Sequence, residues 1–309
     1  MKKVLVAARS FCKTPALVDQ AASIASASGA DISFVDHTLP VDFPHFFEGH
    51  PETEVLVLGR DKLGLDQLSS LPNLKHVVKY GVGLDNIDLD ALAGRQIKLH
   101  WRGGVNALQV AELTIGLMLG LVRNIALSSS LMRQGIWRKE GGRDLGSKVV
   151  AVVGCGHVGS RVVPLLSAFG CQVLICDIED KQNISSAFSA PQVLLDEALS
   201  RCDIATLHVP LTPLTENLIS ERELRLIGSN GFLINTARGK VVDMKAIEDA
   251  LDQGELGGAA FDVYPEEPFR LGSILSHSHV VCTPHIGGGS EEARQAMGSS
   301  VLVFLEKIL

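Results

Sequence analysis

Short apolar runs alternate with longer amphipathic stretches along almost the whole chain. In the first third, the runs that predict strands are Lys3–Ala7, Glu54–Leu58, His76–Val78 and Ile97–His100. Helices are predicted over 14–28, where Thr14 precedes Pro15 as an N-cap precedes a first helical residue, and over 85–93. Apolar strands that alternate with helices are typical of a parallel sheet covered on both faces.

The same alternation becomes sharper after residue 148. Six further strands are predicted, at Val149–Val153, Gln172–Cys176, Ile204–His208, Gly231–Ile234, Gly258–Phe261 and His279–Cys282. Helical segments separate the first five of them, which indicates a second parallel sheet. Between the two strand sets, apolar residues recur at helical spacing over 106–120, a second helical stretch covers 124–132, and glycines mark an irregular connection over 135–146.

A glycine-rich loop lies between the first strand of the second set and the helix that follows it. Gly154, Gly156 and Gly159 form a GxGxxG pattern there, in the segment VVAVVGCGHVGSRVVPLL. The first glycine permits a tight turn, the second lets backbone amides approach a pyrophosphate, and the third permits close helix packing. In this strand–loop–helix context the pattern predicts a dinucleotide site, and a purely structural turn is the weaker alternative.

An acidic residue stands where such a site needs one. Asp177 lies 23 residues after Gly154 and directly follows the next predicted strand. A carboxylate at this position binds the adenosine ribose hydroxyls, although it is also compatible with a solvated strand end. Glu179 and Asp180 follow, and Lys181 is the nearby cation. Because further carboxylates would repel a 2′-phosphate, the sequence favours NAD over NADP.

The position of the glycine loop in the middle of the chain predicts the domain organisation. We expect an α/β fold with two Rossmann-like or flavodoxin-like domains. A doubly wound NAD-binding domain, residues 100–285, is inserted in a smaller substrate domain, residues 1–99 plus 286–309. The last predicted helix, Glu291–Leu309, is compatible with either domain by its pattern and is assigned here to the substrate domain.

Composition excludes several function classes. The chain has 46% hydrophobic residues, which is enough for packed cores. Its net charge is −7, so no basic field exists to hold nucleic acid or an anionic membrane. The longest uncharged apolar run, Leu113–Val122, is far shorter than the ~20 residues of a membrane span. The apolar run after Lys2 and Lys3 is too short for a secretory signal. Six cysteines without a CxxC pair predict free thiols in a cytoplasmic protein.

Three segments after the glycine loop carry candidate catalytic side chains at predicted strand ends. Arg238 follows one strand, Asp262 and Glu267 follow another, and His285 follows the last. Each alone is more often a salt bridge, a loop carboxylate or a turn residue. Together they suit hydride transfer from a 2-hydroxy acid: an Arg fork binds the carboxylate, a His accepts the hydroxyl proton, and a carboxylate orients the His.

At this point the sequence resembles a known family, the NAD-dependent D-isomer-specific 2-hydroxyacid dehydrogenases. The resemblance extends over essentially the whole chain. The motifs that carry it, besides the Gly154 loop, are Lys79–Asp88, Asn106–Glu112, His208–Asn217, Asn235–Asp243, Asp262–Pro268 and Pro284–Gly288.

The resemblance implies roles for individual residues. It makes Arg238, Glu267 and His285 catalytic, with Arg238 on the substrate carboxylate and His285, paired with Glu267, as the acid–base. Further substrate contacts fall on Lys79, Val82, Gly83 and Asn106. Cofactor contacts fall on Gly154, Gly156, His157, Val158, Gly159, Asp177, His208, Val209, Pro210, Thr236, Ala237, Asp262 and Gly287. No metal site is expected.

The resemblance leaves the substrate open. The HIGG segment followed by Glu291 and Glu292 is similar to the glycerate and phosphoglycerate branch, and a chain that ends at Leu309 predicts a short form without a C-terminal regulatory domain. Lys79 stands where related enzymes often have Arg; with Arg102 and Lys139 it is a candidate phosphate contact. 3-Phosphoglycerate, glycerate, glyoxylate and hydroxypyruvate therefore all stay candidates.

Two expectations concern partners. The apolar helix 106–120 and the segment through Trp137 correspond to the two-fold interface of the family, so the resemblance implies a homodimer. The alternative to an enzyme is an NAD(H)-sensing binding protein, similar to the corepressors that share this fold. The Arg, Glu and His set argues for the enzyme.

Overall fold

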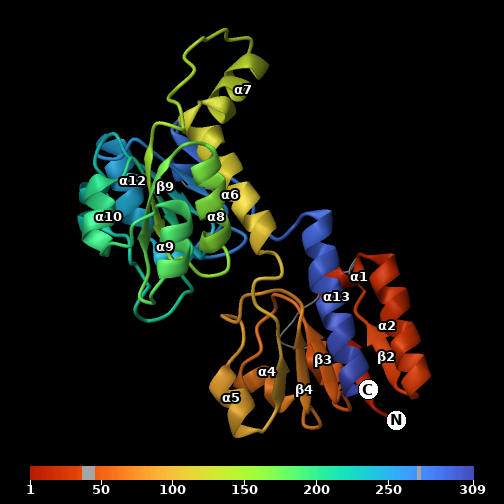
Figure 1. Cartoon of the computed structure of the whole chain (residues 1–309). Helices are drawn as coiled ribbons and strands as arrows, with labels where there is room; N and C mark the ends of the chain where they lie inside the picture. The colour runs from red at the N-terminus through yellow and green to blue at the C-terminus, as the bar shows by residue number, and fades with distance from the viewer. Residues whose placement is uncertain (37–45, 270–272) are drawn as a thin grey trace. The chain divides into compact units, whose positions relative to one another are not determined.

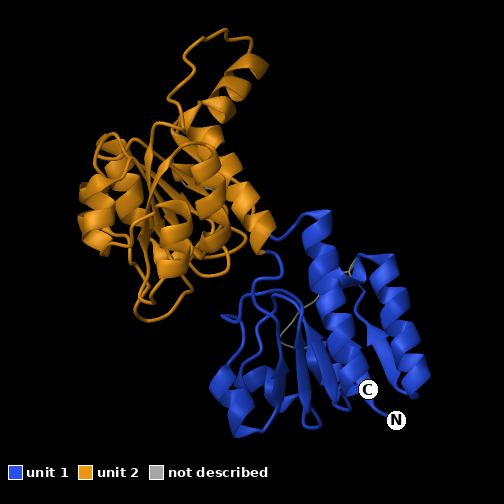
Figure 2. Ribbon diagram, viewed as in Figure 1, with its two compact units in different colours: residues 1–106, 288–309 blue, residues 107–287 orange. Residues whose placement is uncertain are grey.

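The computed structural model describes residues 1–36, 46–269 and 273–309 and divides them into two compact units. Unit 1 comprises residues 1–106 and 288–309, and unit 2 comprises residues 107–287 (Figure 2). Each unit is a parallel sheet flanked by helices (Figure 1), which confirms the expected α/β fold with one domain inserted in the other.

Unit 1 is built on a five-stranded sheet with the order β2-β1-β3-β4-β5. The strands are β1 (Lys3–Val6), β2 (Asp31–Phe34), β3 (Val55–Leu58), β4 (His76–Lys79) and β5 (Lys98–His100). Strand β2 was not predicted. It is an edge strand without a fully buried residue, so its sequence lacks the apolar run by which the other strands were found.

The helices of unit 1 are α1 (Arg9–Cys12), α2 (Pro15–Ser28), α4 (Leu65–Ser69), α5 (Leu89–Gly94) and α13 (Glu291–Ile308), with the short 3-10 turn η1 (Phe47–Gly49). Helix α5 begins later than predicted because the Asp88 side chain accepts a hydrogen bond from Ala91 N and caps it. The C-terminal helix α13 lies beside α2 (Figure 1), and its buried Val301 and Leu305 join the same core as Leu17.

Unit 2 is built on a six-stranded sheet with the order β11-β10-β9-β8-β6-β7. The strands are β6 (Val149–Val153), β7 (Gln172–Cys176), β8 (Ile204–Leu207), β9 (Phe232–Asn235), β10 (Gly258–Phe261) and β11 (Val280–Cys282). The strand order changes direction between β6 and β8: β7 lies on one side of β6, and β8 to β11 lie on the other. Ligands of open α/β sheets bind beyond the carboxyl ends of the strands at such a switch point.

Helices cover both faces of this sheet, and a buried apolar cluster lies under each layer. The helices of unit 2 are α6 (Ala107–Val122), α7 (Ile125–Arg133), α8 (Gly159–Ala168), α9 (Gln182–Phe188), α10 (Leu195–Arg201), α11 (Glu221–Ile227) and α12 (Met244–Asp252), of which α7 buries no residue. Two 3-10 turns, η2 (Gly239–Val241) and η3 (Ser273–Ser276), complete the unit. Among the described residues no single helix is long and apolar enough to cross a membrane; α6 and α7 meet that test only as a pair bent by 63°.

The unit boundaries lie slightly later than 99/100 and 285/286, where we expected them. Residues 100–106 belong to unit 1, and unit 2 begins with the first residue of α6. Residues 286 and 287 belong to unit 2 because Ile286 N and Gly287 N donate hydrogen bonds to Asp262, which follows β10. The change of unit falls after these two bonds.

Candidate active site

The glycine loop connects β6 to α8, and two of its glycines are required by the protein's own packing. Gly154 has φ +88°, and a Cβ there would lie 2.8 Å from the His208 carbonyl group. A Cβ on Gly159 would lie 2.0 Å from Gly154 O. A side chain at either position would therefore collide with backbone that cannot move independently.

Gly156 differs from its two neighbours in the motif. A Cβ at this position would meet no atom within 4 Å, so nothing in the protein's own packing requires a glycine. The residue is exposed and lies just before the N-terminus of α8, whose first turn holds no acidic side chain. Open space beside free amides at a helix N-terminus fits the pyrophosphate of a dinucleotide.

Asp177 is oriented toward this loop. Its carboxylate accepts hydrogen bonds from Cys155 N at 2.6 Å and from Glu179 N at 2.9 Å, and its side chain is 10% exposed. A carboxylate has about four acceptor sites, so two bonds leave capacity for ribose hydroxyls. Lys181 Nζ lies 2.6 Å from Glu179 and 3.8 Å from Asp177. The nearby cation is thus already paired with carboxylates, which disfavours a 2′-phosphate.

His208 follows β8 and lies against the same loop. Its Nε2 is 3.0 Å from Thr206 Oγ1, and burial lowers the pKa of His208 to about 3, so the ring is neutral at physiological pH. Its Nδ1 is buried and has no hydrogen-bond partner among the described residues. Val209 contacts the position that a Gly154 side chain would occupy. Residues 208 and 209 therefore form a wall beside the glycine loop.

The turn that carries Arg238 is held by Asn235, which ends β9 and is fully buried. The Asn235 amide donates to Arg238 O at 2.9 Å and accepts from Ala237 N at 3.0 Å. The Arg238 guanidinium donates to Ala237 O at 2.7 Å and is half-buried. Sequence reasoning assigned no role to Asn235, although a buried amide at a strand end inside the NTARG motif was the available signal.

Two contacts place this turn against its neighbours. The Thr236 hydroxyl, buried with the rest of the residue, lies 2.9 Å from the Thr114 hydroxyl on α6. A Cβ on Gly239 would lie 1.9 Å from the backbone of Tyr264, so the turn packs directly on the loop that leads to Glu267. The Arg238 turn and the Glu267 loop are therefore adjacent.

His285 and Glu267 form the predicted pair. Nδ1 of His285 lies 2.6 Å from Oε2 of Glu267, and the two side chains are 31% and 30% exposed. The other Glu267 oxygen accepts from Tyr264 N at 3.2 Å. With Nδ1 engaged by a carboxylate, Nε2 is the nitrogen through which the ring exchanges a proton with a ligand. His285 has φ +54°, a strained conformation for a residue with a side chain.

Asp262 anchors the segment that bears His285. It is 1% exposed and accepts from the Thr283 hydroxyl at 2.5 Å, from Ile286 N at 2.8 Å and from Gly287 N at 2.8 Å. We expected this carboxylate to contact the nicotinamide amide. In the structure both of its oxygens already hold the loop, and a carboxylate with about four acceptor sites can serve a ligand in addition.

The substrate residues expected in the first domain lie in unit 1. Lys79 was considered as a phosphate contact, but its side chain is buried, and its ammonium donates to Asn86 Oδ1 at 2.7 Å and to Gly59 O. Lys79 thus braces the loop that follows β4. Val82 and Gly83 in that loop are half-exposed, and Asn106 is buried.

The other two candidate phosphate contacts lie in different units. Arg102 belongs to unit 1 and Lys139 to unit 2, and both are exposed.

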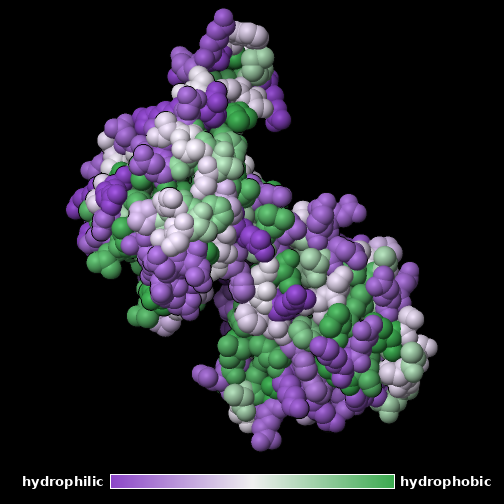
Figure 3. All heavy atoms as spheres, viewed as in Figure 1, coloured by the Kyte–Doolittle hydropathy of each residue, from purple (hydrophilic) through white to green (hydrophobic). Residues whose placement is uncertain are grey.

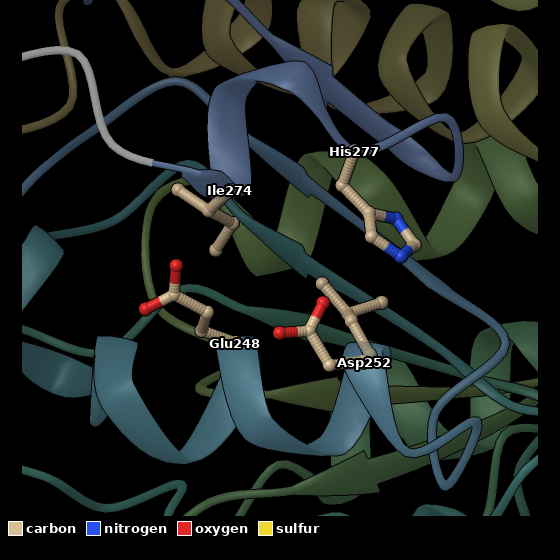
Figure 4. A pocket seen from close by; sticks show the side chains of 5 residues that line it. Glu248, Asp252, Ile274 and His277 are labelled. Carbon is tan, nitrogen blue, oxygen red and sulfur yellow. The ribbon is translucent and has the colours of Figure 1, made fainter.

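A small hollow in unit 2 lies between α12 and η3 (Figure 4). Glu248 and Asp252 project from one side of α12 toward Ile274 and His277. In the part of the chain that the structure describes, no group of three or more His, Cys, Asp or Glu side chains is placed to hold a metal ion. We assign no ligand or reaction to this hollow.

Comparison with known proteins connects this geometry to a family. Residues 115–287 match the family model described as the NAD-binding domain of D-isomer-specific 2-hydroxyacid dehydrogenases. That match contains the glycine loop, Asp177, Arg238, Glu267 and His285.

Curated relatives match over most of the chain. A D-3-phosphoglycerate dehydrogenase of Methanocaldococcus jannaschii is 34% identical over 84% of this chain. The chain spans half of that relative's length. A glyoxylate reductase of Thermofilum pendens is 37% identical over 79% of this chain and 74% of its own length.

The fold of the whole chain also has a solved counterpart. A crystal structure of a Thermus thermophilus protein matches with a TM-score of 0.86 at 28% identity, over 97% of this chain and 94% of the other.

Proposed function

The chain belongs to the D-isomer-specific 2-hydroxyacid dehydrogenase family, and from this premise we propose that it interconverts a D-2-hydroxy acid and its 2-oxo acid with NAD. The observation that carries the proposal is the 2.6 Å contact between His285 and Glu267. It joins a partly exposed imidazole to a carboxylate beside the Arg238 turn, and the two residues follow the carboxyl ends of β11 and β10, strands of the same parallel sheet as β6, which the glycine loop follows.

The residues of unit 2 supply the proton transfer and the charge stabilisation. In oxidation, His285 accepts the hydroxyl proton through Nε2 while Glu267 stabilises the imidazolium through Nδ1. The Arg238 guanidinium binds the substrate carboxylate as a fork and polarises the oxygen at C2. NAD, when bound, would supply the acceptor for the hydride from C2. In reduction the same groups act in reverse, and His285 returns the proton.

NAD is held by the loop and strand ends already described. The amides around Gly156 and the N-terminus of α8, with His157 and Val158, contact the pyrophosphate. Asp177 binds the ribose hydroxyls, and residues 208–210 border the adenosine. Thr236, Ala237, Asp262 and Gly287 border the nicotinamide, as the family resemblance implies.

Unit 1 supplies the remaining substrate contacts in this proposal. The backbone amides of Val82 and Gly83 bind the substrate carboxylate, and Asn106 is a further substrate contact, as the resemblance implies. The buried ammonium of Lys79 positions the loop that bears these amides. D-3-Phosphoglycerate, glycerate, hydroxypyruvate and glyoxylate are the substrate candidates, in line with the names of the two relatives.

We place the enzyme in the cytoplasm. All six cysteines are free, and burial raises the pKa of the Cys12, Cys155, Cys176 and Cys202 thiols. Unpaired, protonated thiols suit a reducing compartment, where disulfides are rare.

The first test is turnover by the purified protein. NADH is incubated with glyoxylate, hydroxypyruvate, phosphohydroxypyruvate, pyruvate, 2-oxoglutarate and a branched 2-oxo acid, and loss of reduced-nicotinamide absorbance is followed. We expect turnover on at least one, and NADPH to be the poorer donor because of Asp177 and its neighbours. The matched variant His285→Gln should lose at least ~100-fold in kcat while NADH binding persists, because general acid–base catalysis contributes about 10²–10⁴-fold.

Two outcomes would overturn this assignment. Full activity of His285→Gln would remove His285 from the proton-transfer role. NADH binding without turnover on any acid in the panel would favour an NAD(H)-sensing binding protein over an enzyme.

A further inference from the structure

We propose that Tyr264 is a positioning residue that holds Glu267 and the His285 segment in register for proton transfer. It does so with two groups, its backbone N–H and its phenolic hydroxyl. The inference rests on the proposed function, since it assigns a role within the same proton-transfer pair. It does not follow from the family motifs that predicted the pair itself.

The contacts of Tyr264 reach both members of the pair. Its N–H donates to Oε1 of Glu267 at 3.2 Å, on the carboxylate whose other oxygen meets His285. Its hydroxyl donates to the carbonyl oxygen of Thr283 at 3.0 Å, with Phe261 O farther away at 3.4 Å. The same Thr283 carbonyl accepts from His285 N at 3.1 Å. Tyr264 therefore contacts the carboxylate of Glu267 directly and is linked to His285 through the carbonyl group of Thr283.

The Tyr264 ring is itself held in place. It stacks on Phe269 with ring centroids 4.8 Å apart and an angle of 21° between the ring planes. The backbone beside it packs against Gly239 at the end of the Arg238 turn. Because the ring cannot swing freely, its hydroxyl acts as a fixed point for Thr283.

The His285 segment needs such restraint. His285 has φ +54°, a left-handed conformation that is strained for a residue with a side chain and persists only where its surroundings enforce it. Thr283 is held from one side by its hydroxyl on Asp262 and from another by the Tyr264 hydroxyl on its carbonyl. Removing the second contact loosens the segment at Thr283, while the hydrogen bonds to Asp262 still hold the rest of it.

The titratable neighbours of this segment leave the Tyr264 contact intact across the working pH range. Burial, followed by the charge of Cys282 and a hydrogen bond with it and then by the charges of Asp262 and Glu267, raises the pKa of Tyr264 well above its usual value, so the hydroxyl stays protonated. Burial likewise raises the pKa of Cys282, which lies next to Thr283. Neither group ionises near neutrality, so the Tyr264 contact persists there.

The test is Tyr264→Phe, which removes the hydroxyl and keeps both the ring stack and the backbone N–H. Loss of one hydrogen bond predicts a kcat about threefold to tenfold lower, with KM for the 2-oxo acid and Kd for NADH within about twofold. A looser pair stabilises the protonated imidazole less. The midpoint of the acidic limb of kcat for oxidation should therefore move to lower pH.

The matched control is Tyr80→Phe, at the other tyrosine of the chain. Tyr80 is buried in unit 1 against Phe11, and its hydroxyl has no hydrogen-bond partner among the described residues. The same atom is deleted, but no hydrogen bond is lost. The acidic limb should stay at its wild-type pH in this variant. Thermal unfolding of both variants checks that neither is simply unfolded.

Failure of this inference and failure of the proposed function give different results. If wild type turns over and Tyr264→Phe has an unchanged kcat and pH profile, the positioning role is wrong and the function stands. If wild type turns over no 2-oxo acid, the function is wrong. An NMR titration of the His285 imidazole in wild type and Tyr264→Phe then still decides the positioning role, because an unchanged midpoint would overturn it.

Discussion

At the scale of single residues, the glycine loop separates what the fold requires from what a ligand requires. Gly154 and Gly159 are surrounded by backbone at distances that exclude a side chain. Gly156 has open space around its Cα, although it stands in the same motif. The sequence predicted different roles for the three glycines from one pattern, and the folded environment shows that the protein's own packing requires only the first and the third.

This difference predicts the behaviour of two matched variants. Gly156→Ala should leave the free energy of unfolding within about 0.5 kcal/mol of wild type, because the new methyl group meets no protein atom. It should weaken NADH binding by ~10-fold or more, since the methyl group occupies the space into which a pyrophosphate fits. Isothermal titration with NADH and urea unfolding measure the two quantities.

The control is Gly159→Ala, whose Cβ would lie 2.0 Å from Gly154 O. It should lose about 1–3 kcal/mol of stability together with NADH affinity, as overpacked sites do. Equal NADH affinity of Gly156→Ala and wild type would show that this loop does not hold the pyrophosphate.

At the scale of elements, strands with apolar runs were predicted well and the polar edge strand β2 was not. A second feature of the unit 1 sheet was also invisible in the sequence. His76 on β4 and His100 on β5 lie side by side, with Nδ1 of the first 3.0 Å from Nε2 of the second. His100 also contacts Phe304 on α13, at 5.7 Å between ring centroids. The two imidazoles thus connect the sheet to the C-terminal helix.

This pair predicts a pH-dependent stability. Burial, then the positive charge of His100 and of the lysines around it, lowers the pKa of His76; burial and Lys98 lower that of His100. The unfolded chain therefore takes up protons first as pH falls. The contribution of the neutral His76–His100 pair to the free energy of unfolding is therefore present above about pH 6.5, the pKa of histidine in an unfolded chain, and is lost below that pH.

Urea unfolding between pH 8 and pH 5 measures this effect. Wild type should lose more stability over that range than His76→Gln, which removes one titrating ring. Identical pH slopes for the two proteins would contradict the prediction.

At the scale of the whole molecule, the segment after α6 carries apolar side chains that the chain itself does not cover. Helix α7 has no buried residue. Ile125, Met132, Ile136 and Trp137 are 56%, 52%, 46% and 74% exposed. Figure 3 shows hydrophobic and hydrophilic residues side by side on this segment. Clustered exposed apolar groups mark interaction surfaces, and we propose that a second copy of the chain covers them.

The expected mass in light scattering is accordingly twice the 33.0 kDa of one chain. The double variant Met132→Lys, Trp137→Glu should shift it to a single chain, because buried unpaired charge opposes association. A control with two charge changes elsewhere, such as Glu248→Lys and Asp252→Lys on α12, should keep the larger mass. A wild-type protein with the mass of one chain would refute the dimer.

The sequence by itself determined the features that depend on neighbours along the chain. Strand–loop–helix order around Gly154, the acidic residue after β7 and the Arg, Glu and His that follow strand ends are local patterns, and each was found before the fold was known. Parallel strands bring such ends to one edge of a sheet, so their order in the chain was enough to predict a common site.

Only the tertiary structure decided which polar groups are used inside the protein and which face outward. A lysine is typically a surface cation, yet the ammonium of Lys79 is buried and donates hydrogen bonds to Gly59 O and to the side-chain amide oxygen of Asn86. Tyr264, in the role proposed above, reaches the His285 segment through its hydroxyl on Thr283 O, a contact between segments 19 residues apart that no local pattern encodes. The physical reason is that burial and hydrogen bonding between distant segments depend on packing, whereas periodicity depends on local order alone.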